Sequence, residues 1–324
     1  MRAALIQALG EPPGVHDAPE PARGEGQALI DVGAAPLNPI DLAIASGGFY
    51  AGRPEVPYVP GKEGVGTVVE GDSLSPGTRV YFRMPGGLGG SAGALAERVA
   101  AAEAEAIELA GGVDDALAAC FGTAGLAAWL ATEWRARLAP GETVLVLAAS
   151  GAVGQIAVQV AKLLGAGRVV AAARDAHGLA RARELGADAT VNLGKADGVD
   201  DLAEAFRAAA GGTVDVTIDP LWGEPGTAAV HAAAEFGRIV QLGQSAGAEA
   251  TLPSALLRGN SLSILGHTNV AAPREVTAAA YRRMVEEAAA GRLTVDHEVI
   301  ELERAGEAWR RQADFPHRKL VLRP

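Results

Sequence analysis

The sequence predicts an α/β protein in which a doubly wound parallel sheet is joined to a β-rich domain. Up to about residue 120, short apolar or alternating runs such as ALIDVGAA and TRVYFRM are broken by Pro and Gly clusters, as is typical of short strands and turns. From about Pro140, apolar strand-like runs alternate with helical segments up to about residue 268. Such alternation indicates βαβ units in a parallel sheet.

The alternating region contains six expected strands and four expected helices. The strands are TVLVLAA, RVVAAA, ATVNL, VDVTIDPL, RIVQLG and LSILGHT. The helices are VGQIAVQVAKLLGA, HGLARARELGA, DDLAEAFRAAAGG and TAAVHAAAEFG. In the first helix, Val153, Ile156, Val160 and Leu163 recur at three- and four-residue spacing, so that helix is expected to pack one face on the sheet.

The C-terminal tail is expected to return to the first domain. After Pro273 the chain has a long helical segment, REVTAAAYRRMVEEAAAG, then DHEVIEL, a short helix around ERAGEAWRR and a last strand, KLVLR. We therefore expect one domain at 1–120 and 271–324, with the sheet domain at 121–270 inserted into it.

Composition favours small-molecule partners. The 324 residues are 49% hydrophobic and carry a formal net charge of −11. No long block of one charge is present, so the sequence does not predict a nucleic-acid or anionic-membrane binder. No unbroken run of about 20 apolar residues predicts a membrane span, and a cytoplasmic location is expected. Cys120, the only cysteine, stands in the apolar run ALAACFG and is expected to be a small buried hydrophobe.

A glycine-containing turn predicts a dinucleotide site. Ala148, Gly151 and Gly154 stand three residues apart between a strand and a helix. Glycine in such a turn lets the backbone approach a pyrophosphate, which the helix N-terminus holds. The residues expected to contact the cofactor there are Ser150, Gly151, Ala152, Val153 and Gly154.

The end of the second strand, RVVAAARDAHG, favours NADPH over NADH. An NAD site has an acid at this position to bind the ribose 2′-hydroxyl, and here Ala173 takes that place, with Arg174 next. Arg174 is expected to pair with a 2′-phosphate. The alternative is that Arg174 is a solvated surface residue. The negative charge of the neighbouring Asp175 is unfavourable for phosphate binding.

Several motifs in order resemble the medium-chain dehydrogenase/reductase superfamily, particularly its quinone oxidoreductases. They are LNPIDLAIASGGFY, PGKEGVGTVVEG, AASGAVGQIAVQVAKLLGA, ELGADATVNL and HRKLVL. The resemblance covers nearly the whole chain. It implies a GroES-like catalytic domain interrupted by a Rossmann domain, an active-site cleft between them, and a homodimer that continues the Rossmann sheets.

The chain departs from the zinc alcohol dehydrogenases of that superfamily at both zinc-ligand motifs. Asn38 stands where those enzymes have a zinc-binding Cys, and Lys62 of GKEG stands where they have a His. An amide and an ammonium cannot replace a thiolate and an imidazole as zinc ligands. The cysteine-rich structural zinc loop is also absent, so we expect no metal.

Without a Lewis acid, the expected substrates are already electrophilic. Quinones and α,β-unsaturated carbonyls accept a hydride at a conjugated system and spread the charge to oxygen, so the protein has to align the reactants and supply hydrogen bonds or a proton. The candidate catalytic residues are Asn38, Asp41, Tyr50 and Lys62.

Each candidate has two interpretations. Asn38 is expected either to donate its amide to the nicotinamide ribose or substrate, or only to form a turn. Tyr50 is expected either to face the substrate as a hydrogen-bond or proton donor, or to pack. Asp41 is expected to orient neighbours or pair with Lys62, and to stay ionised.

The resemblance implies further cofactor contacts, spread over the rest of the chain. They are Thr123, Gly243, His267, Asn269, Arg318 and Lys319. His267 has the alternative of a structural hydrogen bond at a strand end. Leu193 stands where relatives have a Tyr against the adenosine.

Three functions remain open from the sequence. The first is NADPH:quinone oxidoreductase. The second is a reductase of the C=C bond of enones, enals or enoyl thioesters. The third is a non-catalytic NADPH-binding sensor.

Overall fold

The computed structural model describes residues 1–324 and divides into two compact units. Unit 1 comprises 1–123 with 282–324, and unit 2 comprises 124–281. The expected boundaries were 120/121 and 270/271. The second change of unit falls inside one helix, α9 (Arg274–Ala289), which a sequence pattern cannot divide.

Unit 1 is built on antiparallel strands whose apolar side chains pack together. Its larger sheet has the order β14-β15-β3-β4-β5-β7, with β6 also paired to β3, and β1 and β2 form a separate pair. The strands are β1 (Arg2–Leu5), β2 (Gly14–Asp17), β3 (Gln27–Pro36), β4 (Glu63–Glu70), β5 (Arg79–Arg83), β6 (Arg98–Ala102), β7 (Ile107–Glu108), β14 (His297–Glu301) and β15 (Lys319–Arg323). Its helices are α1 (Pro39–Ala45), α2 (Asp115–Cys120) and α10 (Ala305–Ala313), with 3₁₀ turns at Glu103–Glu105 and Leu302–Arg304.

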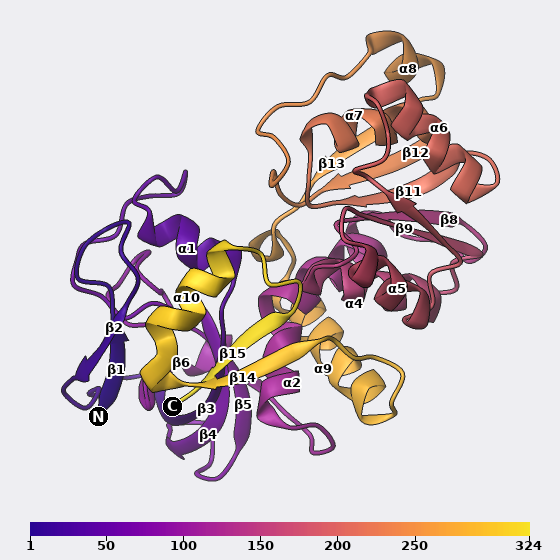
Figure 1. Cartoon of the computed structure of the whole chain (residues 1–324). Helices are drawn as coiled ribbons and strands as arrows, with labels where there is room; N and C mark the ends of the chain where they lie inside the picture. Colours follow the sequence, from indigo (N-terminus) through magenta and orange to yellow (C-terminus); the bar gives the residue numbers. More distant parts are fainter. The chain divides into compact units, whose positions relative to one another are not determined.

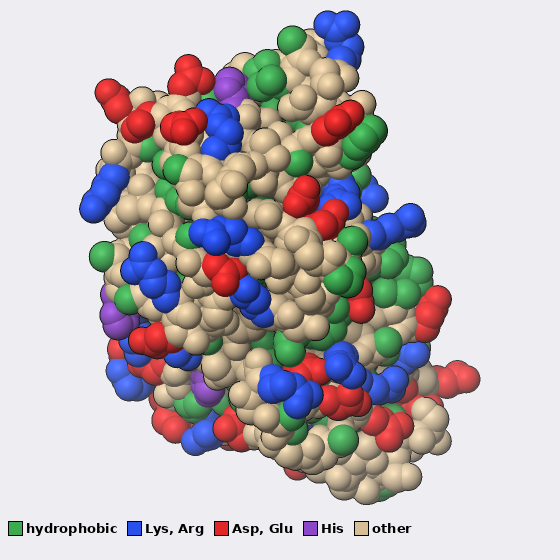
Figure 2. Space-filling view, turned by 90° about the vertical axis from the view of Figure 1, so that its right-hand side faces the viewer, with side chains coloured by type: hydrophobic (Ala, Val, Ile, Leu, Met, Phe, Trp, Pro, Cys, Tyr) green, Lys and Arg blue, Asp and Glu red, His purple; other side chains and the backbone are tan.

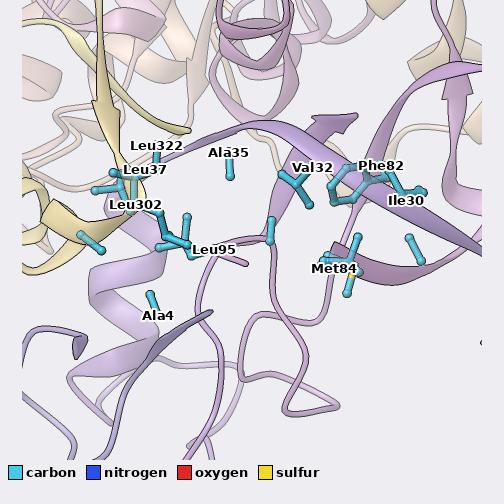
Figure 3. Close-up of a cluster of buried hydrophobic side chains, with 14 of the residues drawn as sticks. Ala4, Ile30, Val32, Ala35, Leu37, Phe82, Met84, Leu95, Leu302 and Leu322 are labelled. Carbon is cyan, nitrogen blue, oxygen red and sulfur yellow. The ribbon is translucent and has the colours of Figure 1, made fainter. Parts of the chain in front are cut away.

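The C-terminal tail completes this sheet, as predicted. Strand β15 pairs antiparallel with β3 and parallel with β14. Its Leu322 joins Ile30, Leu37, Phe82 and other apolar residues of the N-terminal segment in one buried cluster (Figure 3). The burial of these side chains is the main force that holds two distant parts of the chain in one unit.

Unit 2 is a doubly wound parallel sheet of six strands in the order β10-β9-β8-β11-β12-β13. The strands are β8 (Thr143–Leu147), β9 (Arg168–Ala173), β10 (Ala189–Asn192), β11 (Val214–Asp219), β12 (Ala233–Gln241) and β13 (Ser263–Gly266). The helices are α3 (Leu126–Leu130), α4 (Ala152–Leu163), α5 (Ala176–Glu184), α6 (Val199–Ala210), α7 (Gly223–Ala232) and α8 (Ser254–Gly259), with a 3₁₀ turn at Asn269–Ala271. Helices α4 and α5 cover one face of the sheet, and α6 and α7 cover the other (Figure 1).

Strand β12 begins earlier than the sequence pattern predicted. The segment TAAVHAAAEFG was expected to be helical throughout, but α7 ends at Ala232 and Ala233 already pairs with Val214 of β11. Phe236 has a φ of +61° and donates its backbone N–H to the carbonyl of Asn260. A bulge between two pairing registers therefore replaces the expected last helical turn.

The stretch Asp115–Arg135 is a nearly continuous helix that includes α2, α3 and two π-helical turns, Phe121–Gly125 and Ala131–Arg135. By length and composition alone it could span a membrane, although charged residues interrupt its apolar run. However, 78% of its most apolar window is buried inside the protein. Burial of that extent is typical of a core helix.

Candidate active site

The turn between β8 and α4 has the geometry of an anion-binding turn. Gly151 is the N-cap of α4, and no side chain caps the helix there. The first amide groups of a helix have no partner within the helix, and they carry the positive end of its dipole. The residues expected from the sequence, Ser150 to Gly154, therefore form an uncapped helix N-terminus at the carboxyl edge of the sheet.

Gly151 and Gly154 in this turn differ in how much room the protein leaves for a side chain. A Cβ on Gly154 would lie 2.3 Å from the carbonyl oxygen of Ala148, so close packing of the helix against the turn requires glycine. A Cβ on Gly151 would meet nothing nearer than the same carbonyl oxygen at 3.6 Å, which is ordinary contact, and Gly151 has a φ of −82°. Nothing in the protein itself requires glycine at 151, so the space beside it is open to a ligand.

The loop after β9 lies against this turn. A Cβ on Gly178, in the first turn of α5, would lie 2.2 Å from the Cβ of Ser150. Asp175 accepts a hydrogen bond from the Gly178 backbone N–H at 2.6 Å and so caps α5. One oxygen of its carboxylate is thus used within the protein to cap α5. Arg174, directly after strand β9, is exposed.

On the other half of the sheet, three residues follow strand ends. Gly243 follows β12, and its carbonyl accepts a hydrogen bond from the Gln241 side chain. His267 follows β13, and Asn269 begins the next 3₁₀ turn. His267 is 7% exposed; burial lowers its pKa to about 4, and a side-chain hydrogen bond with Asn269 opposes the shift. A cofactor contact and a structural hydrogen bond both stay predictions for His267.

Sequence reasoning did not single out Asp219, which is fully buried at the end of β11. One carboxylate oxygen accepts the backbone N–H groups of Leu221 and Trp222, both at 2.8 Å. The other faces Gly226 of α7, where a Cβ would lie 2.8 Å away. Burial raises the pKa of Asp219. Asp219 therefore shapes the β11–α7 loop; an acid at a strand end was the only sequence signal.

In unit 1, Asn38 is the centre of a buried polar network. Its amide nitrogen donates to a carboxylate oxygen of Glu63 at 2.9 Å and to the carbonyl of Pro36 at 3.3 Å, and its amide oxygen accepts from the ammonium of Lys319. Asn38 and Glu63 are each 1% exposed, and Lys319 is 3% exposed. Asn38 is also the N-cap of α1.

This network corrects two expectations. The Asn38 amide has no free hydrogen for a ribose or a substrate, so Asn38 is a positioning residue here. Lys319 was expected to reach the cofactor, but its ammonium is enclosed with Asn38 and Glu63. Burial lowers the pKa of Lys319, while Glu63 opposes that shift. Sequence reasoning missed Glu63, because an acid next to a glycine carries no distinctive pattern.

Glu63 also holds the first π-helical turn, Phe121–Gly125, of the helical stretch Asp115–Arg135. Its second carboxylate oxygen accepts the hydroxyl of Tyr81 at 2.9 Å and the backbone N–H of Thr123 at 2.6 Å. The adjacent Gly122 has no room for a side chain, because a Cβ would lie 2.2 Å from Glu63. Thr123 was expected to contact the cofactor, and its backbone N–H is committed to Glu63.

Asp41 and Lys62 do not form the expected side-chain pair. Asp41 is 1% exposed and accepts backbone N–H groups, from Asn38 at 2.8 Å and from Lys62 at 3.1 Å. The Lys62 ammonium instead donates to the carbonyl of Pro85 at 2.6 Å. Burial raises the pKa of Asp41 to about 7, and the backbone N–H of Asn38 opposes the shift. The expected side-chain pair with Lys62 is therefore not formed, and Asp41 instead holds the backbone of Asn38 and Lys62.

Of the remaining residues considered from the sequence, Tyr50 and Arg318 lie on the surface and Cys120 lies in the core. Tyr50 is 84% exposed, so the expectation that it packs is wrong; its ring lies 4.5 Å from that of Phe49. Arg318 is half exposed and 3.8 Å from Glu298. Cys120 is fully buried, as predicted, and burial raises its pKa to about 12.

Both units match known domain families. Residues 24–111 match the alcohol dehydrogenase GroES-like domain, and residues 152–287 match the domain described as zinc-binding dehydrogenase. No group of three or more His, Cys, Asp or Glu side chains in the structure is arranged to hold a metal ion.

Individual relatives narrow the family. Mouse quinone oxidoreductase-like protein 2 is 33% identical over 271 residues, which are 82% of this chain and 74% of the relative. The quinone oxidoreductase of Thermus thermophilus, solved also as its complex with NADPH, is 30% identical with a TM-score of 0.83, and all of both chains is covered. A segment of a phenolphthiocerol/phthiocerol polyketide synthase of Mycobacterium tuberculosis is 33% identical over 78% of this chain and 11% of that protein. This chain is an oxidoreductase of the medium-chain dehydrogenase/reductase superfamily and belongs to its quinone oxidoreductase branch.

Proposed function

We propose that this protein is an NADPH-dependent, metal-free reductase of quinones. The observation that carries the cofactor assignment is Gly151, a glycine that the protein's own packing does not require, at an uncapped helix N-terminus. A pyrophosphate approaching the amide groups of Ala152 and Val153 explains why no side chain stands there. The T. thermophilus relative, solved with NADPH, supports the same cofactor.

The 2′-phosphate is assigned to Arg174. Ala173 leaves no carboxylate to accept a ribose hydroxyl, Asp175 is occupied as a helix cap, and Arg174 is exposed. Arg174→Ala should weaken NADPH far more than NADH, because only NADPH carries the phosphate. Equilibrium titration with both cofactors measures this. Equal losses for both would remove the basis for preferring NADPH.

The reaction needs a hydride and a proton. NADPH supplies the hydride, which is added to the conjugated substrate while a proton is taken up; a quinone becomes a hydroquinone and NADP⁺ is released. The absence of a metal is proposed from Asn38 and Lys62, whose side chains replace the zinc ligands and are engaged within unit 1. Chelator treatment should therefore leave turnover unchanged.

Reduction of an activated C=C bond is the alternative, and the similarity to a segment of a polyketide synthase favours it. The deciding experiment follows NADPH oxidation on chelator-treated protein with a quinone panel and, separately, with enones, enals and enoyl thioesters. Faster quinone turnover supports the proposal, and faster alkene turnover supports the alternative. Binding of NADPH without turnover of either class would indicate a non-catalytic sensor.

The proposed partners are small electrophilic substrates and a second copy of the chain. On the face in Figure 2, acidic and basic side chains are interspersed without a large area of one sign, in keeping with a protein that does not bind nucleic acid. Strand β13 ends the order of the six-stranded sheet. A homodimer that continues the sheet through this edge would be detected by light scattering, and a monomer at all concentrations would contradict it.

A further inference from the structure

The polar side chains inside unit 1 do not fit a metal ion, although one matching domain family is described as zinc-binding dehydrogenase. An amide and an ammonium, of Asn38 and Lys62, stand at the positions of two zinc ligands. The two buried acids of the network are already used, because each carboxylate oxygen of Asp41 and of Glu63 accepts at least one hydrogen bond from the protein. A metal ion would have to displace these bonds.

A cation of the chain itself lies in this network. Lys319 is 3% exposed, and its ammonium donates to the amide oxygen of Asn38. The backbone of Lys319 is fixed at the start of β15, where its N–H donates to the Asp296 carbonyl at 2.8 Å. The carbonyl of the next residue, Leu320, accepts the N–H of Leu37 at 2.9 Å. The sheet therefore holds the ammonium one hydrogen bond away from the residue that replaces a zinc-binding Cys.

Lys319 is the only one of the four lysines that is buried. Lys162, for comparison, is partly exposed and pairs with Asp188 at 2.6 Å. A buried ammonium is costly unless charges and acceptors compensate for its lost hydration. Burial lowers the pKa of Lys319, and the charge of Glu63 is the largest influence that opposes the shift. The buried Glu63 is thus the main electrostatic partner of this lysine.

The donors and acceptors of the network fit together in one orientation. An ammonium can only donate hydrogen bonds, and a carboxylate can only accept them. The Asn38 amide lies between the two, with its oxygen towards Lys319 and its nitrogen towards Glu63. A reversed amide would place its NH₂ against the ammonium and its oxygen against the carboxylate. The two buried charges together therefore fix the direction of the Asn38 side chain.

We propose that the Lys319 ammonium is the internal cation of unit 1 and supplies the positive charge that a metal ion would otherwise supply in this network. It balances the buried Glu63 and orients Asn38, so Lys319 is a positioning residue. The cation that the position accepts is a primary ammonium rather than a divalent metal. The inference goes beyond the proposed function, because neither a cofactor nor a substrate enters it.

Chemical rescue tests the proposal. Lys319→Ala removes the propylammonium part of the side chain and should lower the thermal midpoint of unfolding. At matched ionic strength, n-propylammonium chloride should raise this midpoint again with saturation, whereas propan-1-ol, of similar size without the charge, and Zn²⁺ should not. The wild type and Lys319→Met, whose side chains fill the space, should not respond. An equal response of Lys319→Ala to propan-1-ol would overturn the proposal in favour of packing alone.

A double-mutant cycle decides the case in which Lys319→Ala does not fold. Lys319→Met should lower stability less in a Glu63→Gln background than in the wild type, because the carboxylate left without its cation is gone. Additive losses would overturn the proposal, and so would wild-type protein that retains one zinc ion per chain after dialysis against Zn²⁺ and then buffer. None of these measurements contains NADPH, so a failure of the proposed cofactor use would leave their outcome unchanged.

Discussion

The polar interior of unit 1 and the carboxyl edge of the sheet in unit 2 contrast in how their buried groups are partnered. In unit 1, Asn38, Glu63 and Lys319 satisfy one another, and Asp41 accepts two backbone N–H groups. In unit 2, the start of α4 has no side-chain cap. The network of unit 1 is satisfied within the chain and positions its backbone, whereas the uncapped start of α4 leaves amide groups for the proposed pyrophosphate.

The largest effect is expected from breaking the complete network. Lys319→Met removes the buried ammonium that donates to the Asn38 amide oxygen and that interacts electrostatically with the buried Glu63, and should lower the free energy of unfolding by about 3–5 kcal/mol. Chemical denaturation measures it. Lys62→Met is the matched control; Lys62 is only partly buried, so its loss should be smaller. Equal stability of Lys319→Met and the wild type would show that the network does not hold unit 1 together.

The glycine turn offers a matched pair of alanine substitutions. Gly154→Ala forces a Cβ against the Ala148 carbonyl and should cost about 1–3 kcal/mol of stability. Gly151→Ala should change stability by less than about 0.5 kcal/mol, yet weaken NADPH at least about tenfold because the methyl enters the space for the pyrophosphate. Thermal unfolding and NADPH titration separate the two. Normal NADPH binding by Gly151→Ala would contradict the cofactor site.

The two regions should also respond oppositely to pH. The pKa of Asp41 is raised from 3.8 to about 7, so the folded state binds the proton more tightly and stability falls as pH rises between those values. The pKa of His267 is lowered from 6.5 to about 4, so stability rises with pH over that range. Because the two contributions have opposite signs, the free energy of unfolding of the wild type changes less with pH than either contribution alone. Asp41→Asn should remove the fall and His267→Phe the rise; if neither variant alters the unfolding profile between pH 4 and 7, the two assignments are wrong.

The smallest effect on stability is expected at Tyr50. Because its side chain is 84% exposed, Tyr50→Phe should change the free energy of unfolding by less than about 0.5 kcal/mol. If the phenol donates a hydrogen bond or a proton to substrate, turnover should fall while NADPH affinity is unchanged. Steady-state kinetics and titration measure this. An unaltered rate would remove Tyr50 from the reaction.

The sequence by itself was sufficient for the sheet, the glycine turn and the family. Strand and helix periods are local, so β8, α4 and β9 could be predicted from neighbouring residues, and the return of the tail followed from what remained after the parallel sheet. The early start of β12 was missed because its first pairing is made with β11, outside the local pattern. Glu63 was missed because its partners are 25, 18 and 60 residues away along the chain.

Only the tertiary structure decided what each candidate side chain does. It committed the Asn38 amide nitrogen to Glu63 and Pro36, committed the Lys319 ammonium to the Asn38 amide oxygen, and made Asp175 the cap of α5. The physical reason is that a residue type sets which hydrogen bonds and charges are available, while burial and long-range contacts decide which of them are already satisfied. Sequence therefore determined the chemical inventory of this protein, and folding determined which part of it is left for a ligand.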